Sequence, residues 1–190
     1  MTKKISQKNI ETESGDVVGR DKIVNAPKQV KISHIRRLFR DLSTEYGNED
    51  KIKQICFELT AYQIEKDVIG LEAKLNDAGC TNNYIENAEV VKQKFAKKLY
   101  HYQEYQSAQR IFVLLLAQIS ELFRAKILPL LNEGKDVIEL QNDIYEEIIN
   151  PIYELLSKEA SEDNVLYLNP EEIKGMIYYL TGRCHIKWIA

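Results

Sequence analysis

One long stretch of the chain determines the expected fold. Residues 81–129 are TNNYIENAEVVKQKFAKKLYHYQEYQSAQRIFVLLLAQISELFRAKILP, and the only glycine or proline among them is Pro129. Apolar and tyrosine side chains recur at alternating steps of three and four residues, the heptad spacing of helices that pack lengthwise. The positions of this seam are Tyr84, Ala88, Val91, Phe95, Lys98, Tyr102, Tyr105, Gln109, Phe112, Leu116, Ile119 and Phe123. The stretch predicts one continuous helix from about Asn83 to Leu128.

Further helices are predicted on both sides of this stretch. Ser33 is a suitable N-cap for a first helix that ends near Gly47. A second helix is expected over residues 49–78, closed by Gly79, and its own heptad seam should pack antiparallel on the long helix. Another helix should span residues 136–158, kinked or split at Pro151 because proline lacks a backbone N–H.

The C-terminal residues follow a different pattern. Residues 165–168 are short, apolar and bounded by Asn169-Pro170, which favours a strand. Pro170 then opens a predicted helix over residues 171–180. In residues 184–188, Cys, Ile and Trp alternate with His and Lys, as in a strand with one apolar face.

The expected fold class is therefore mostly α. It is a long antiparallel helical hairpin or bundle with a small strand–helix–strand C-terminal cap and an N-terminal arm. The arm comprises residues 1–30, which are polar and lack helical periodicity; they form either a flexible tail or an extended arm that orders on a partner. The helical domain is expected over residues 31–134 and a C-terminal region over residues 135–190.

Composition excludes several classes of function. The 190 residues carry a net charge of −3 with a pI near 5.7, which does not favour bulk affinity for nucleic acid or membranes. The N-terminus lacks the apolar core of a signal peptide. The most apolar run, residues 111–117, is much shorter than the ~20 residues of a membrane span. Three widely spaced cysteines fit free thiols in a reducing cytoplasm. We expect a cytoplasmic protein that does not contact a membrane.

Catalytic residue types do not occur at catalytic spacing. The sequence has no G-x-x-x-x-G-K-[ST] loop and no C-x-x-C motif, and its histidines are far apart, so we expect no cofactor and no metal. Cys184 and His185 are neighbours in a predicted strand and would point to opposite faces. Glu172 and Lys174 are two residues apart in a predicted helix and would not face each other. We therefore expect no catalytic residues and no enzymatic activity.

A basic patch offers an alternative function. Lys92, Lys94, Lys97 and Lys98 are interleaved with aromatic side chains as far as Tyr105. Such a helix face can bind nucleic-acid phosphates, so a nucleic-acid-binding module is the alternative interpretation. A solvated helix face is the other possibility, and the net acidity of the chain favours it.

The C-terminal run of residues 173–188, IKGMIYYLTGRCHIKW, resembles the closing motif of proteins from bacterial ABC-three-component conflict systems. This group includes the Lamassu-type antiphage and antiplasmid systems. The specific part of the motif is Gly-Met-Ile-Tyr-Tyr-Leu-Thr-Gly-x-Cys-His-Ile-x-Trp, and the resemblance extends back to about Ile138. Residues 15–23, GDVVGRDKI, also resemble a short motif found near the N-termini of related proteins.

The resemblance implies particular partners. Such systems combine an SMC-like ABC ATPase that senses foreign DNA, an effector that is often a nuclease, and a small accessory subunit. This chain has no room for a nuclease domain, so it resembles either the accessory subunit or an effector-like protein without its toxic domain. The implied function is a non-catalytic accessory subunit that bridges or restrains the effector and the ATPase. DNA would then be contacted only indirectly, through the complex.

The predicted partner-binding residues all lie in this C-terminal motif. They are Gly175, Met176, Tyr178, Tyr179, His185 and Trp188. Apolar side chains should form one face on the short helix and a second face on the strand after it. One face should pack on the helical body and the other should meet the ATPase or the effector. The alternative is that both faces belong to the core.

Overall fold

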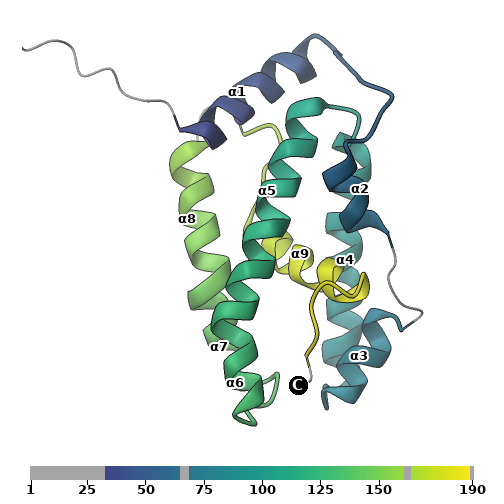
Figure 1. Cartoon of the computed structure of the whole chain (residues 1–190), viewed down its shortest axis with the longest axis vertical. Helices are drawn as coiled ribbons and strands as arrows, with labels where there is room; N and C mark the ends of the chain where they lie inside the picture. The colour runs from purple at the N-terminus through teal and green to yellow at the C-terminus, as the bar shows by residue number, and fades with distance from the viewer. Residues whose placement is uncertain (1–32, 65–68, 161–163, 189–190) are drawn as a thin grey trace, which may run out of the picture. The chain divides into compact units, whose positions relative to one another are not determined.

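The computed structural model describes residues 33–64, 69–160 and 164–188 (Figure 1). The regular secondary structure within these ranges is helical, and no strand occurs in them. The predicted N-terminal arm, residues 1–30, lies outside the described residues. The mostly α fold class is confirmed for the part of the chain that is described.

The prediction of one continuous helix over residues 83–128 is wrong, because the chain reverses at residues 103–105. α4 (Asn82–Tyr102) and α5 (Gln106–Leu122) run in opposite directions on the two sides of this turn (Figure 1). Phe95 of α4 and Phe112 of α5 belong to the same predicted seam, and their ring centroids lie 5.8 Å apart. The seam therefore folds back on itself. The antiparallel hairpin is formed by α4 and α5, and not by the predicted helix over residues 49–78 packed on the long predicted helix over residues 83–128.

Side chains from distant elements stabilise the break between α4 and α5. The carboxylate of Glu45 accepts hydrogen bonds from the Ser107 N–H and hydroxyl, at 3.0 and 2.6 Å, in the first turn of α5. A carboxylate in this position also complements the positive end of the helix dipole. The buried amide of Gln109 donates to the carbonyl of Gln103 at 2.6 Å. These bonds satisfy backbone groups that a continuous helix would pair, so the turn forms without glycine or proline.

The first helix is confirmed as α1 (His34–Gly47). Its N-cap is Ser33, as predicted, and the Ser33 hydroxyl accepts from the Arg36 N–H at 3.2 Å. The same hydroxyl donates to the carboxylate of Glu159, which also pairs with Arg36 at 3.3 Å. The start of α1 is thereby joined to a residue far along the chain.

The predicted second helix over residues 49–78 is wrong. Its place is taken by an irregular segment, then α2 (Phe57–Gln63) and α3 (Leu71–Asp77). In the irregular segment, the Ile52 N–H donates to the Glu104 carbonyl and the Cys56 N–H donates to the side-chain oxygen of Gln109, both at 2.7 Å. This backbone is paired with the α4–α5 hairpin instead of with itself, so it does not form a helix. Gly79, with a φ of +76°, follows the end of α3 as predicted.

Two prolines distort the helices that follow. The π-helical turn η1 (Phe123–Ile127) joins α5 to α6 (Leu128–Asn132), and η2 (Tyr145–Ile149) joins α7 (Gln141–Ile144) to α8 (Asn150–Glu159). Pro129 and Pro151 lie in the first turn after these two π turns. A proline has no N–H, and its ring crowds the carbonyl four residues earlier, which in both cases lies inside the π turn. The predicted distortion at Pro151 is confirmed, although regular helix begins at Gln141 rather than near residue 136.

The C-terminal helix is confirmed as α9 (Pro170–Gly182). A reciprocal capping box starts it: Asn169 accepts from the Glu172 N–H at 3.0 Å, and Glu172 accepts from the Asn169 N–H at 3.2 Å. α9 packs chiefly against α4 and also contacts α3, α5 and α8. One hydrophobic core therefore contains side chains from both predicted regions, 31–134 and 135–190.

The predicted strand–helix–strand cap is wrong, because neither flanking segment is a strand. The carbonyls of residues 165 and 166 accept from the Tyr102 hydroxyl at 3.2 Å and the Lys98 ammonium at 2.6 Å. These carbonyls are therefore bonded to side chains of α4 and not to a neighbouring strand. After α9, Cys184 has a φ of +62°, which a strand does not allow. The N–H groups of residues 184 and 185 donate to the carbonyls of Thr181 and Leu180, at 3.0 and 2.9 Å. This pair of bonds is a Schellman motif that reverses the chain.

Candidate partner-binding surface

Most of the predicted partner-binding residues lie in the core. Tyr178 and Tyr179 are 2% and 5% exposed, Trp188 is 3% exposed, and Gly175 and Met176 are buried. Of the six residues, only His185 is partly exposed. A contact between these residues and a partner stays a prediction, and the surface that can offer such a contact in the folded chain is the surface around His185.

Residues 183–188, the C-terminal hook, fold back onto the helical body. The Trp188 indole N–H donates to the hydroxyl of Thr181 at 2.9 Å, and its ring lies edge-to-face on Phe123 with centroids 5.1 Å apart. Lys74 of α3 donates to the Thr181 carbonyl at 2.6 Å and lies 2.7 Å from the Cys184 sulfur. The hook is thereby fixed to α9, η1 and α3.

A groove of about 600 Å³ lies beside this hook. It is lined by Phe123, Arg124, Leu128, Asn132, Cys184, His185, Ile186 and Lys187. The imidazole ring of His185 lies 5.1 Å from the ring of Tyr62, so α2 supports the residue at this edge of the groove. The groove combines apolar walls with cationic and aromatic side chains, which is a composition common at protein interfaces.

A partly buried polar cluster lies beside the middle of α9. The Tyr178 hydroxyl donates to the Tyr84 hydroxyl at 2.8 Å, and the amide of Gln141 donates to the same Tyr84 oxygen at 2.8 Å. Burial raises the pKa of both tyrosines. The Lys174 ammonium, 5.9 Å from each tyrosine ring centroid and 3.1 Å from the Gln141 side-chain oxygen, has its pKa lowered by burial. Tyr178 of the C-terminal motif is therefore engaged in hydrogen bonds within the folded chain.

The predicted nucleic-acid patch is largely neutralised by carboxylates. Lys92 pairs with Glu89 at 2.5 Å, Lys94 with Glu171 at 2.7 Å, and Lys98 with Glu172. Lys97 is exposed and has no carboxylate partner among the described residues. Two of the four lysines, Lys94 and Lys98, therefore form ion pairs that join α4 to the start of α9, and the pair of Lys92 with Glu89 lies within α4.

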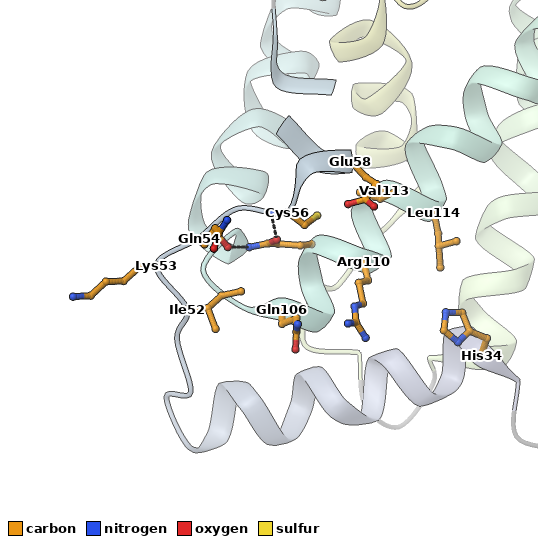
Figure 2. A pocket seen from close by; sticks show the side chains of 11 residues that line it. His34, Ile52, Lys53, Gln54, Cys56, Glu58, Gln106, Arg110, Val113 and Leu114 are labelled. Atoms are coloured by element: carbon orange, nitrogen blue, oxygen red, sulfur yellow. Dashed lines mark hydrogen bonds between the residues drawn. The ribbon is translucent and has the colours of Figure 1, made fainter. Parts of the chain in front are cut away.

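A second open site on the described chain was not predicted from sequence. It is a pocket of about 740 Å³ between the start of α1, the segment before and into α2, and the first turns of α5 (Figure 2). Its lining residues are His34, Ile52, Lys53, Gln54, Cys56, Glu58, Gln106, Gln109, Arg110, Val113 and Leu114. We call it the α1–α5 pocket.

A buried glutamine shapes the α1–α5 pocket. Gln109 is 1% exposed and makes three hydrogen bonds: it accepts from the Cys56 N–H at 2.7 Å and donates to the carbonyls of Gln54, at 3.1 Å, and Gln103, at 2.6 Å. The dashed lines in Figure 2 mark the first two of these bonds, at Cys56 and at Gln54. One side chain therefore holds the 54–56 segment and the α4–α5 turn against α5. The sequence signal for this role is that Gln109 is a polar residue in a heptad seam made mostly of apolar and tyrosine side chains.

The side chains around the α1–α5 pocket are binding groups of mixed character. In Figure 2, the Arg110 guanidinium, the Gln106 amide and the His34 imidazole are directed into the space between α1 and α5. Apolar surface comes from Ile52 and from Val113 with Leu114. The next residue after Cys56, Phe57, is 84% exposed and is the most exposed large hydrophobic side chain described.

The described residues contain no cluster of three or more His, Cys, Asp or Glu side chains that could hold a metal ion. Among the helices that the structure describes, none combines the length and the apolar character needed to cross a bilayer.

The described residues form an all-helical domain in which α9 packs into the centre of the core, and their surface carries the α1–α5 pocket and the groove beside His185. The family model for C-terminal domain 9 of the ABC-three component (ABC-3C) systems matches residues 70–188, and the chain belongs to this family. The resemblance inferred from the C-terminal motif is confirmed at this level. The matched residues extend from the start of α3 to Trp188, so α1, α2 and two walls of the α1–α5 pocket precede the shared domain. The chain matches no curated protein and no solved structure.

Proposed function

We propose that this chain is a non-catalytic accessory subunit of a bacterial antiphage or antiplasmid complex, where it bridges or restrains the effector and the SMC-like ABC ATPase. The observation that carries the proposal is the family match over residues 70–188, because a domain of a three-component system implies partner components. An effector-like protein without its toxic domain would dock through the same kind of surface.

The geometry supports a docking role in two ways. The shared motif in α9 is used for the core, so it supplies a rigid body on which surface groups keep their positions. The surface itself offers two hollows, the α1–α5 pocket and the groove beside His185, both of which combine apolar walls with hydrogen-bond donors. Hollows of this kind receive the anchor side chains of partner proteins.

Co-purification of the three components tests the proposal. The tagged full chain is expressed with the ATPase and effector subunits of its system, and the eluted complex is analysed by size-exclusion chromatography. We expect all three proteins in one peak, and we expect less effector with the ATPase when this chain is omitted. Elution of the chain without either subunit would contradict the proposal.

The nucleic-acid alternative has one observation in its favour. Lys97 is exposed without a carboxylate partner among the described residues, and Tyr100, one helical turn away, is 75% exposed. A cation beside an exposed ring can hold a phosphate and a stacked base. If this alternative holds, the purified chain shifts single-stranded DNA in a salt-sensitive way and Lys97→Glu abolishes the shift. Our proposal predicts no shift at physiological salt.

A further inference from the structure

The α1–α5 pocket presents unused donors for a carboxylate. Many cations of this chain have carboxylate partners, for example Lys51 with Glu104 at 3.1 Å and Lys126 with Glu147 at 3.1 Å. Arg110 has no such partner among the described residues, although its guanidinium is directed into the pocket near Gln106 and His34 (Figure 2). A guanidinium binds carboxylates with two parallel hydrogen bonds, so the free group here is complementary to an acidic side chain.

Apolar surface next to these donors narrows the class of ligand. Ile52, Val113 and Leu114 line the pocket, and Leu114 is 39% exposed. Phe57, which lies in sequence between the lining residues Cys56 and Glu58, exposes 84% of its surface to water. A phosphate backbone gains nothing from such walls, whereas a peptide can place an apolar side chain on them and a carboxylate on the arginine.

The pocket is held in shape before any ligand arrives. The three hydrogen bonds of Gln109 fix the 54–56 segment, and the ion pair of Arg36 with Glu159 fixes the start of α1. A preformed site binds at a smaller entropic cost than one that must order on contact.

The walls of the pocket have different origins within the chain. α5 belongs to the shared family domain, whereas His34 and residues 52–58 precede it. Only a chain that carries both parts can form the pocket. This makes the pocket a suitable place for recognising a partner of one system among several that share the domain.

We propose that the α1–α5 pocket binds a peptide segment of a partner subunit that presents an aspartate or glutamate beside an apolar side chain. The carboxylate pairs with Arg110, and the apolar side chain lies between Leu114 and Phe57. The proposal rests on the function proposed above, and it specifies which surface makes the contact and with what chemistry.

The test uses two substitutions in the pocket and two matched substitutions elsewhere. Arg110→Glu reverses the charge at the donor, and Phe57→Ala removes the exposed ring. Lys97→Glu and Tyr100→Ala make equivalent changes at exposed positions of α4, outside the pocket. Each full-length variant is co-expressed with the ATPase and effector subunits, and the affinity of the complex is measured by titration. We expect each pocket variant to weaken one subunit about tenfold or more, and each control to change binding less than about twofold.

A photo-crosslinker identifies what occupies the pocket. p-Benzoylphenylalanine is placed at position 57, and the crosslinked peptide is sequenced by mass spectrometry. We expect a segment of the ATPase or the effector that contains an acidic residue next to an apolar one. A crosslink to a second copy of this chain, or to a segment without an acidic residue, would overturn the inference, as would DNA binding that Arg110→Glu abolishes.

The two proposals fail in different ways. If the three proteins co-purify but both pocket variants bind normally, the pocket inference is wrong and the accessory function stands. If the unaltered chain binds neither subunit, both are wrong. Circular dichroism and thermal melting of Arg110→Glu and Phe57→Ala should match the unaltered chain, since both side chains are exposed, and this excludes misfolding as the cause of weak binding.

Discussion

At the scale of single residues, Gly175 determines how closely α9 approaches α4. A Cβ atom at this position would lie 2.7 Å from the Val91 carbonyl oxygen and 3.0 Å from the Cβ of Phe95. The first of these atoms is backbone and cannot move aside without shifting α4. Gly175, which lies in the C-terminal motif of residues 173–188, therefore allows the close packing of α9 on α4.

We predict that Gly175→Ala lowers the free energy of unfolding by about 1–3 kcal/mol, because overpacking separates the two helices. The 1–3 kcal/mol is the net loss, after subtraction of the gain of roughly 1 kcal/mol that alanine brings to a helix interior. Urea denaturation followed by circular dichroism measures the difference. The matched control is Gly182→Ala, where the nearest atom to an added Cβ is the flexible Lys92 Cδ at 3.5 Å. Equal effects of the two substitutions would show that the close approach is not limiting.

The hydrogen-bonded Tyr84–Tyr178 pair should make the free energy of unfolding fall at alkaline pH. Burial raises the pKa of Tyr178 above its ordinary value of 10.0, so the folded chain keeps the phenol proton where the unfolded chain releases it. The stabilisation is fully present below the unfolded pKa and is lost as the pH rises above it. Each pH unit above about 10 should lower the free energy of unfolding by up to ~1.4 kcal/mol for each tyrosine that stays protonated.

We predict that Tyr178→Phe makes this alkaline loss of stability less steep, because phenylalanine has no phenol proton that the unfolded chain could release. At neutral pH the variant should be less stable by about 1 kcal/mol, since the hydrogen bond to Tyr84 is lost. Urea midpoints measured between pH 8 and about pH 11 give the slope. Tyr167→Phe, at a side chain that is 76% exposed, is the control and should leave the slope unchanged. An unchanged slope for Tyr178→Phe would contradict the assignment.

At the scale of elements, the break between α4 and α5 is held by the Gln109 amide together with the Glu45 carboxylate. Gln109 is the residue that closes the turn at residue 103 and holds the segment before α2, and its partners are all backbone groups. Without it, those groups lose their hydrogen bonds in a partly buried place, where each unpaired group costs about 1–3 kcal/mol.

We predict that Gln109→Leu destabilises the chain by roughly 3 kcal/mol, although leucine suits the heptad seam and favours a helix. Amide hydrogen exchange should be faster at Cys56, whose N–H loses its acceptor. Gln118→Leu places the same change on an exposed position of α5 and should alter stability by less than about 0.5 kcal/mol. If the two variants are equally stable, the turn is held by other contacts, such as Glu45 with Ser107.

Helix ends that depend on neighbouring residues were predictable from sequence, whereas helix breaks that depend on distant residues were not. Ser33 and Asn169-Pro170 cap their own helices, and Pro151 acts on its own turn, so their effects follow from local chemistry. The turn at residues 103–105 is instead held partly by Glu45, which is far away in sequence. A heptad pattern identifies the residues that lie in a helix interface. It does not show whether the seam packs on a separate helix or folds back into two helices that pack on each other.

The candidate site shows the same division. The lysines of α4 were recognisable as a basic run, but their ion pairs with the first turn of α9 required the fold. The alternation in residues 184–188 suggested a strand; Ile186 and Trp188 are indeed buried, but a Schellman turn places them there. The α1–α5 pocket is built from three separate segments, and no local pattern identifies such a site.

At the scale of the whole molecule, one core joins the described residues from α1 to the C-terminal hook. Trp188 is the only tryptophan of the chain and packs on Phe123, so its fluorescence reports directly on the hook. We predict that unfolding in urea gives the same midpoint by tryptophan fluorescence and by far-ultraviolet circular dichroism, as in a two-state transition. Leu116→Ala, at a fully buried position of α5, should lower both midpoints together by the equivalent of about 2–5 kcal/mol.

A fluorescence change at lower urea than the loss of helix would contradict this prediction. It would mean that the hook detaches before the bundle unfolds, and that the C-terminal residues form a separate cooperative unit.

The position of α9 also has a consequence for how the protein is made. A ribosome synthesises the α4–α5 hairpin long before residues 170–188, yet α9 is the element that covers the α4 face around Gly175 and Phe95. Until residues 170–188 have been synthesised, that apolar face has no cover from α9, and apolar surface exposed in this way promotes aggregation of a nascent chain. A chain that stops before Trp188 would lack the ring that packs on Phe123 and the indole N–H that bonds to Thr181, so this part of the core would stay open to water.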